Sequence, residues 1–351
     1  MLHLTTLTSF RRARTLAAQL PPLGARFGVR GWEQVQRDLA TVVRGWLHGE
    51  HFQFDVRSAG LIRPDLSLPT YAGLVPEGGL APIYNLLDRT GGATLYTTRV
   101  SRGRARDFRG GRLSYDDHRG TDFVTPVGMP IVAAAPGIVA LVRDRWLRGG
   151  LTLSVDHGHG VVTQYSHLSQ SLVELGQIVR RGEPIALGGA SGYDLVQFFP
   201  YVPPHVHFMV WMDGQPVDPF LAPGEAPRPG CWCEENRPLP SGPLPDDPLP
   251  EASPVDELAL ERITSACIDP LLREELAQAA ASPVSLAALL EDALHHQFES
   301  WPQAFWHERV RPPLDPDRAA RALRVRISLP LPSSEYTGAR FADAPWTAPP
   351  A

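Results

Sequence analysis

The stretch from residue 117 to 208 contains three segments: His118-Arg-Gly-Thr-Asp122, Gln164-Tyr-Ser-His167-Leu168 and His205-Val-His207. Residues two apart on a strand project to the same face of a sheet, so a strand would point His205 and His207 into one space. His118 and Asp122 are four apart, but Arg-Gly-Thr is a poor helix interior, and the Phe-Val that follows is strand-like. We therefore predict that this pair lies in a turn that leads into a strand.

The sequence around these segments is typical of an antiparallel β domain, either sandwich or barrel, which we place at residues 95–221. Short runs rich in Val, Ile, Thr and Tyr follow one another with turn residues between them. Glycines fall where hairpin turns would need positive φ. The expected strands are Thr94–Val100, Pro130–Ala134, Gly137–Asp144, Leu151–Asp156, Val161–His167, Pro184–Leu187 and His205–Met212. The expected turn glycines are Gly128, Gly137, Gly158, Gly160, Gly176 and Gly182.

The regions on either side predict α-helical flanks, so the fold class is mainly β with helical N-terminal and C-terminal regions. Residues 1–94 indicate an irregular layer with one amphipathic helix, Trp32–Trp46. Residues 222–254 are rich in proline and poor in apolar side chains, which predicts a stiff linker. Residues 255–330 predict a small, mainly helical module, and residues 331–351 a disordered tail. Within the module we expect helices at Val255–Cys267, Pro270–Ala281 and Val284–Phe298, then a strand at Leu323–Leu329.

Composition narrows the function classes. The 351 residues are enough for two or three folding units, and 33 basic against 38 acidic residues give a net charge of −5. This balance argues against a nucleic-acid partner. No apolar run reaches the roughly 18 to 20 residues of a membrane-spanning helix, and no secretory signal is visible, so the sequence leaves localisation open. Three cysteines are too few for a disulfide framework.

The three segments have the residue types of a catalytic metal site. Two histidines and an aspartate would leave one tetrahedral position of a zinc ion open for water. Zinc lowers the pKa of bound water and polarises a carbonyl oxygen, which suits amide hydrolysis. The strand pattern does not decide whether His205 or His207 contacts the metal. The other one, together with His167, could orient the water, accept its proton and stabilise the oxyanion.

The same residues carry a family resemblance, in three blocks that occur in order. These blocks are His118-Arg-Gly-Thr-Asp122-Phe with Pro126-Val-Gly-Met-Pro130, then Val155-Asp-His-Gly-His-Gly160 through Gly188-Gly-Ala-Ser-Gly192, then Pro204-His-Val-His-Phe208 with Val217-Asp-Pro219. Over a little more than a third of the chain they resemble the lysostaphin and LytM type metallopeptidases, peptidase family M23.

The resemblance implies a compact antiparallel β groove with one zinc ion, held by His118, Asp122 and His207. It implies that His167 and His205 are the catalytic histidines. It also implies that the substrate is a peptide cross-bridge or stem peptide of bacterial peptidoglycan, often cut at or near glycine. We therefore predict a zinc metalloendopeptidase that acts on peptidoglycan or a related glycine-containing peptide.

Two features depart from the family pattern. The segment Tyr193–Pro204 is long and aromatic where the family commonly has a few residues, so we expect it to border the cleft and reshape substrate access. Met209 stands where an acidic residue is frequent, which would alter the support of the neighbouring histidine.

Other polar residues have simpler structural interpretations. We expect His157 and His159 to be solvated turn residues, and Cys231-Trp-Cys233 lacks the paired ligands of a second metal or redox site. The arginines between Arg102 and Arg112 are expected to form a solvated loop. Two other functions stay open: a non-catalytic module that regulates cell-wall enzymes, and a phosphocarrier that uses two nearby histidines. The sequence does not identify a protein partner for the helical module.

Overall fold

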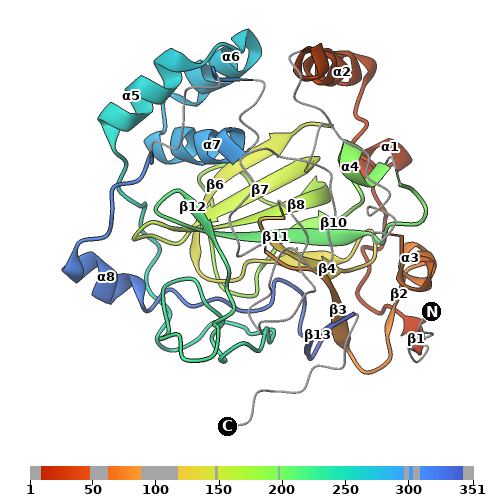
Figure 1. Ribbon diagram of the computed structural model, residues 1–351. Coiled ribbons are helices and arrows are strands. Elements are labelled where there is room, and N and C mark those ends of the chain that lie inside the picture. Colours follow the sequence, from red (N-terminus) through yellow and green to blue (C-terminus); the bar gives the residue numbers. More distant parts are fainter. Residues whose placement is uncertain are drawn as a thin grey trace.

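The computed structural model describes residues 9–47, 62–87, 118–146, 149–196, 198–295, 300–302 and 309–342 (Figure 1). The strand expected at Thr94–Val100 and the arginines between Arg102 and Arg112 lie outside these residues.

A mixed, mostly antiparallel sheet lies at the centre of the molecule and confirms the predicted mainly β fold (Figure 1). Its strands are β3 (Leu80–Asn85), β4 (Thr121–Val124), β5 (Pro130–Val132), β6 (Gly137–Asp144), β7 (Leu151–Asp156), β8 (Val161–Ser171), β9 (Ile178–Val179), β10 (Pro184–Gly188), β11 (His205–Met212), β12 (Gln215–Val217) and β13 (Gly338–Phe341). Across the described ranges the order is β13-β3-β4-β11-β8-β7-β6-β9, with β10 beside β8 and β5, and β12 beside β11. β13 is parallel to β3, whereas β4, β11, β8 and β7 are successively antiparallel. A separate ladder joins β1 (Phe10–Arg12) to β2 (Leu74–Pro76).

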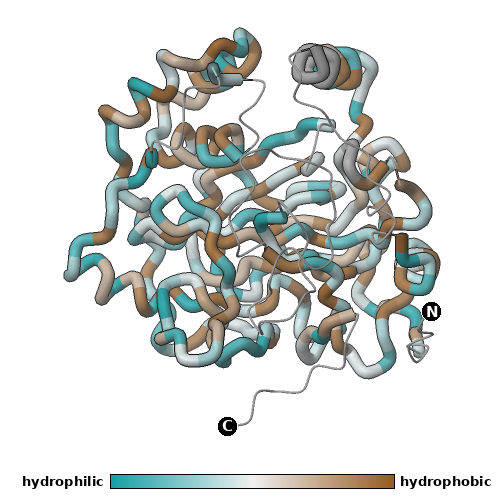
Figure 2. Tube along the Cα trace, in the orientation of Figure 1, coloured by the Kyte–Doolittle hydropathy of each residue, from teal (hydrophilic) through white to brown (hydrophobic). Residues whose placement is uncertain are grey.

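Helices flank the sheet, which confirms the predicted helical flanks (Figure 1). They are α1 (Leu23–Arg26), α2 (Trp32–Leu47), α3 (Pro64–Tyr71), α4 (Tyr193–Val196), α5 (Glu257–Ala266), α6 (Pro270–Ala279), α7 (Pro283–His295) and α8 (Pro316–Ala322). Aspartates fix several helix starts: Asp256 accepts a hydrogen bond from the amide of Ala259, and Asp269 from that of Leu271. Hydrophobic and hydrophilic residues alternate along α5 to α7, as amphipathic helices require (Figure 2).

Turn glycines behave as expected with one exception. Gly128, Gly158, Gly160, Gly176 and Gly182 have φ values between 76° and 85°. Gly137 does not have positive φ; a Cβ there would lie 2.5 Å from Val155 Cγ1 and 2.6 Å from the carbonyl oxygen of Asp156. The prediction for Gly137 is therefore wrong in its reason, because the position requires close backbone approach rather than a left-handed turn.

Residues of β11 point alternately into the main core and to the opposite face of the sheet, which carries His205 and His207. Val206, Phe208 and Val210 are buried in the main hydrophobic cluster. His205 and His207 lie on the opposite face, and farther along it Met209 packs with Val162 and Trp211. The indole of Trp211 then donates to Gln164 at 2.8 Å, and Gln164 donates to Asp292 of α7 at 2.7 Å. Met209, a departure from the family pattern, thus belongs to a small apolar cluster that lies between the histidines of β11 and the helical module.

The main core draws on residues from both flanks of the predicted β domain. Val75, Ala81 and Ile83 join it from the N-terminal side, and Val325, Ile327, Leu329, Leu331, Tyr336 and Phe341 from the C-terminal side. β13 lies within the predicted tail, so the prediction of disorder is wrong for Gly338–Phe341. The segment expected to be a strand at Leu323–Leu329 makes an isolated bridge from Ile327 to Trp232 rather than a continuous strand. The domain boundaries themselves stay a prediction.

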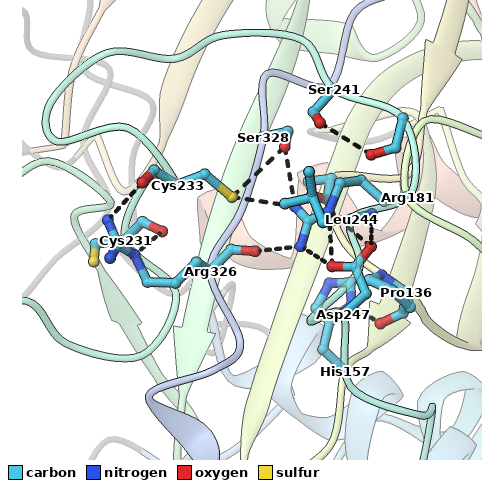
Figure 3. Close-up of polar contacts among 12 residues, drawn as sticks. Pro136, His157, Arg181, Cys231, Cys233, Ser241, Leu244, Asp247, Arg326 and Ser328 are labelled. Carbon is cyan, nitrogen blue, oxygen red and sulfur yellow. Dashed lines mark hydrogen bonds and ion pairs between the residues drawn. The ribbon is translucent and has the colours of Figure 1, made fainter.

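The proline-rich segment 222–254 packs against the sheet, contrary to the prediction that it is too poor in apolar groups to do so. Trp232 is 1% exposed and packs against Phe123, Phe208 and Phe220. The guanidinium of buried Arg181 donates to Asp247 at 2.5 Å and to the backbone carbonyl of Arg326 at 2.9 Å (Figure 3). Side-chain contacts that are distant in sequence therefore hold this segment in place.

The helical module packs on the sheet around β6. Leu260, Ile263, Leu272 and Leu290 form one cluster with Ala140 and Leu141. Figure 1 shows α5, α6 and α7 together at the β6–β7 side of the sheet, away from α1, α3 and α4. No helix in the described ranges combines the length and the apolarity needed to cross a bilayer.

Candidate metal centre

Strand register brings Asp122 and His207 together. They are directly opposed on antiparallel β4 and β11, so their side chains share a face. The turn before β4 passes very close to β11: a Cβ on Gly120 would lie 2.6 Å from the carbonyl oxygen of Phe208 and 2.9 Å from His207 Cε1. Only glycine can lie this close to the β11 backbone. The turn through Gly120 brings the His118 side chain beside that of Asp122. The predicted turn leading into a strand is confirmed for His118, which precedes the strand, whereas Asp122 is the second residue of β4 itself.

His167 reaches the site through a backbone irregularity. Ser166 is opposed to His207, so regular alternation would turn His167 toward the core with Tyr165. His167 has φ of 62°, and the register between β7 and β8 shifts near this point. The following Leu168 takes the core position, while the His167 ring centroid lies 4.9 Å from that of His205 and 6.0 Å from that of His207. A β-bulge of this kind re-aims a side chain to the other face.

Backbone carbonyls fix the orientation of three imidazoles. Nδ1 of His118 lies 2.9 Å from the carbonyl oxygen of Leu86, Nδ1 of His167 lies 2.8 Å from that of Ser191, and Nδ1 of His205 lies 2.8 Å from that of Pro203. A carbonyl oxygen can only accept, so Nδ1 carries the proton in each ring. In the neutral ring Nε2 then holds the lone pair, free to bind a cation or accept a proton.

Asp122 is the common neighbour of the histidines. Its Oδ2 lies 3.0 Å from His118 Nε2, and its Oδ1 lies 2.8 Å from His207 Nδ1 and 3.6 Å from His205 Nε2. Two acceptors, a carboxylate oxygen and the lone pair of His118 Nε2, approach at hydrogen-bond distance only if a proton or a metal cation lies between them. One potential ligand atom from each of His118, Asp122 and His207 lies within 4.8 Å of the others. This donor set fits zinc, which binds imidazole nitrogen and carboxylate oxygen.

Charges in the site shift the pKa values of the metal-free groups in opposite directions. Burial lowers the pKa of His118, but the Asp122 carboxylate and hydrogen bonds raise it to a net value above the ordinary one. Burial raises the pKa of Asp122, yet His118, His205 and the histidine hydrogen bonds hold it well below its usual range. Burial lowers the pKa of His167 well below its usual range, and the charges of His205 and His207 add to this. Burial also lowers the pKa of His207, only partly offset by Asp122.

The five predicted site residues therefore come together, and the other candidates lie elsewhere. His157 and His159 are 1% and 6% exposed, so the prediction that they are solvated is wrong. His157 bonds through Nδ1 to the carbonyl of Pro136 and through Nε2 to Thr163, and His159 pairs with Glu251 at 3.0 Å. Cys233 lies 3.5 Å from the Arg181 guanidinium in the packed segment shown in Figure 3.

Sequence reasoning missed the groups that orient the histidines. The carbonyls of Leu86, Pro203 and Ser191 are backbone groups that every residue has, so the amino-acid sequence cannot indicate them. Tyr84 was missed as well; its ring centroid lies 5.7 Å from that of His205. The sequence does not indicate that Tyr84 lies near His205, because this follows only once β3 is known to pair with β4.

The long segment Tyr193–Pro204 packs on the N-terminal region. Phe199 meets Phe27 and Tyr71 edge-on at centroid distances of 5.2 Å and 5.0 Å. The amide of Arg63 donates to the carbonyl of Tyr201 at 2.9 Å. The end of the segment supplies the Pro203 carbonyl that orients His205. The segment is thus both packed locally and connected to the site.

Comparison with known proteins matches the part of the chain that contains this site. Residues 116–219 match the family model described as Peptidase family M23, and all five predicted site residues fall within them. Over 105 residues the chain is 40% identical to the peptidoglycan DD-endopeptidase ShyB of Vibrio cholerae and 35% identical to the peptidoglycan DD-endopeptidase ShyA of the same organism. Each match covers 30% of this chain and 23% of the relative, so less than a quarter of each relative's length is spanned. A solved structure, a zinc-containing peptidase from Vibrio cholerae, shares 33% identity over 39% of each chain, with a TM-score of 0.27.

Proposed function

We propose that the peptidase family M23 domain of residues 116–219 is a zinc-dependent endopeptidase, and that it hydrolyses peptide bonds in the cross-links or stem peptides of peptidoglycan. The observation that carries the proposal is the position of Asp122 between His118 Nε2 and His207 Nδ1, with the other nitrogen of His118 bonded to a carbonyl. The substrate class is supported by two relatives that are peptidoglycan DD-endopeptidases.

Three side chains would hold one zinc ion: His118 through Nε2, Asp122 through its carboxylate, and His207 through Nδ1. The hydrogen bond from His118 Nδ1 to the Leu86 carbonyl is the outer contact that zinc-binding histidines usually make. Three protein ligands leave one position for a water or substrate oxygen, as in catalytic sites. When bound, zinc supplies a Lewis acid that polarises the scissile carbonyl and makes a nearby water more acidic.

His167 and His205 would handle the protons of the reaction. Each donates Nδ1–H to a backbone carbonyl, so Nε2 of each neutral ring is available as a base, and Nε2 of His205 lies 3.6 Å from Asp122. We infer that one ring accepts a proton from the attacking water and that a protonated ring returns it to the leaving amine. The other ring, when protonated on both nitrogens, donates from Nε2 a hydrogen bond to the oxygen that gains negative charge.

The test uses the full chain loaded with zinc and a purified, cross-linked muropeptide dimer. We expect conversion of dimer to monomers, detected by chromatography and mass spectrometry, and about one zinc per chain by metal analysis. A chelator should stop the reaction and added zinc should restore it. His205→Ala should keep zinc and lose cleavage, whereas His207→Ala should lose both.

Parallel incubation with oligoglycine distinguishes the two substrate classes that the family resemblance allows. Cleavage of oligoglycine alone would overturn the assignment to the cross-link of the muropeptide dimer and indicate a glycine-containing peptide, while leaving zinc peptidase activity in place. Folded, zinc-loaded protein that cuts neither substrate would contradict the proposal. Folded protein that binds no zinc would favour a non-catalytic module.

A further inference from the structure

The N-terminal arm, defined as residues 22–38, lies outside the family match and contacts the turn behind His167. The carbonyl oxygen of Arg26 accepts a hydrogen bond from the amide of Ala190 at 2.8 Å. Two residues later, Gly28 has a φ of 77° and its backbone packs closely against Ser191 of that turn. A Cβ on Gly28 would be 3.0 Å from Ser191 Cβ and 3.2 Å from the amide nitrogen of Gly192. The arm and the turn are therefore in close backbone contact.

The turn matters because it holds His167 in a strained conformation. The Ser191 carbonyl accepts from His167 Nδ1 at 2.8 Å, and the carbonyl of Gly149 accepts from the His167 amide at 2.7 Å. The Ser191 hydroxyl also accepts from the amide of Leu151 at 3.0 Å, which joins the two turns. A non-glycine residue at φ of 62° persists only where its surroundings determine it from several sides.

The arm also contacts the second turn. Arg30 donates to the carbonyl of Ser169 at 2.8 Å and pairs with Asp144 at 2.6 Å, at the end of β6. The buried carboxylate of Asp38 accepts from the amide of Trp146 at 2.6 Å. These contacts brace the β6–β7 hairpin, and those of Arg26 and Gly28 brace the turn at residues 190–192. The hairpin and the turn supply the two carbonyls that hold His167.

We propose that the N-terminal arm positions His167 for catalysis and that Gly28 is a positioning residue, acting through the Ser191 carbonyl. The catalytic meaning of this inference rests on the proposed function, but the contact itself does not. The arm extends the catalytic support beyond the family domain to a part of the chain well before the family match begins at residue 116.

The test compares Gly28→Ala with Gly176→Ala in the full chain. Gly176 has φ of 82°, and a Cβ at this position would have nothing within 4 Å, so its alanine variant carries similar backbone strain without a new contact. In Gly28→Ala the turn must shift by a few tenths of an ångström, which we expect to lower kcat on the order of tenfold with KM and zinc content little changed. Gly176→Ala should keep the parent kcat.

A second readout does not depend on catalysis. The imidazole Nδ1–H of His167 is buried against Ser191, so its proton should exchange slowly with solvent in nitrogen-resolved NMR spectra. Gly28→Ala should accelerate this exchange, and Gly176→Ala should not. Arg30→Met, which removes the contacts to Ser169 and Asp144 at a partly exposed position, should give a smaller change in the same direction if Gly28→Ala does not fold.

Parent-like exchange and parent-like kcat in Gly28→Ala and Arg30→Met would overturn the inference. Equal losses in Gly28→Ala and Gly176→Ala would overturn it too, because backbone strain alone would then explain them. Faster exchange in a chain that cuts no peptidoglycan would support the positioning contact while the proposed function fails.

Discussion

Asp122 and Asp156 are two buried carboxylates of the same sheet, with 3% and 0% exposure, but their partners differ in kind. Asp156 accepts from the amide and hydroxyl of Ser253 at 2.9 Å and 2.6 Å, and Arg311 lies 3.4 Å away. These donors carry their protons permanently. Asp122 instead faces imidazoles whose free nitrogens act as acceptors once neutral. A buried carboxylate with permanent donors is structural, whereas one that faces lone pairs is suited to share a metal.

The largest expected effect comes from removing the charge at the first of these carboxylates. Asp122→Asn should lose stoichiometric zinc and lower peptidoglycan cleavage on the order of a thousandfold or more, because a bound metal supplies several kcal/mol of transition-state stabilisation. Metal analysis and the muropeptide assay measure both losses. Asp156→Asn is the matched control: it should keep zinc while unfolding more easily. Zinc retained at full stoichiometry in Asp122→Asn would remove the distinction between the two sites.

The second carboxylate is best tested through its cation. Arg311 is fully buried between Asp156 and Glu291, whose Oε1 lies 2.6 Å from the guanidinium. Arg311→Met would leave both carboxylates buried without a cation, so we expect a loss of about 3 to 5 kcal/mol in the free energy of unfolding. Urea denaturation measures it.

Two further variants serve as controls for the stability loss expected in Arg311→Met. Arg237→Met breaks a pair whose side chains are 52% and 57% exposed and should change the stability by less than about 1 kcal/mol. A triple variant with Asp156→Asn, Glu291→Gln and Arg311→Met should recover part of the loss, because no charge stays buried. A single Arg311→Met variant as stable as the parent would show that water reaches these carboxylates.

The contrast also explains what the sequence could predict. For the side chains around Asp122, alternation predicted that His205 and His207 share one face, and the Arg-Gly-Thr spacing predicted a turn before a strand. The choice of His118, Asp122 and His207 as ligands was implied by the family resemblance. The bulge at His167 depends on tertiary contacts, and regular alternation would have assigned that residue to the core. Asp156 and Arg311 are separated by 155 positions, and no local pattern connects them.

The packing of the proline-rich segment and the strand β13 were not predicted, for a related physical reason. Local composition describes the proline-rich segment as a linker because it has few apolar residues per unit length. The burial of Trp232 depends on the faces of Phe123, Phe208 and Phe220, which come from other parts of the chain. β13 is similarly predictable only with β3 already in place, since its backbone groups pair with that strand.

A third prediction concerns an imidazole that lacks a carboxylate partner. Burial lowers the pKa of His157 to about 4, from an ordinary value of 6.5. Between these values the unfolded chain binds more protons than the folded one, so His157 makes the protein less stable as the pH falls from 6.5 to 4. The full difference corresponds to about 3 kcal/mol at 1.36 kcal/mol per pH unit.

Other groups titrate in the same range, so the prediction is a difference between proteins. His157→Gln cannot gain a charge, and its free energy of unfolding should fall less steeply with decreasing pH than that of the parent. Urea denaturation of both metal-free proteins at several pH values between 7 and 4 gives the two slopes. Parallel curves would mean that the imidazole of His157 is solvated enough to be protonated in the folded state.

The smallest effect is expected at His159, which lies two residues from His157 but pairs with a carboxylate at the surface. Its Nδ1 is 3.0 Å from Glu251, whose side chain is 58% exposed, so water screens the pair and it should contribute less than about 1 kcal/mol. His159→Asn keeps a residue type that tolerates the local φ of 54°. We expect unchanged zinc content, unchanged cleavage and near-parental stability. Loss of zinc in this variant would show that the imidazole of His159 takes part in metal binding. The lone pairs held toward Asp122 would then not define the metal site by themselves.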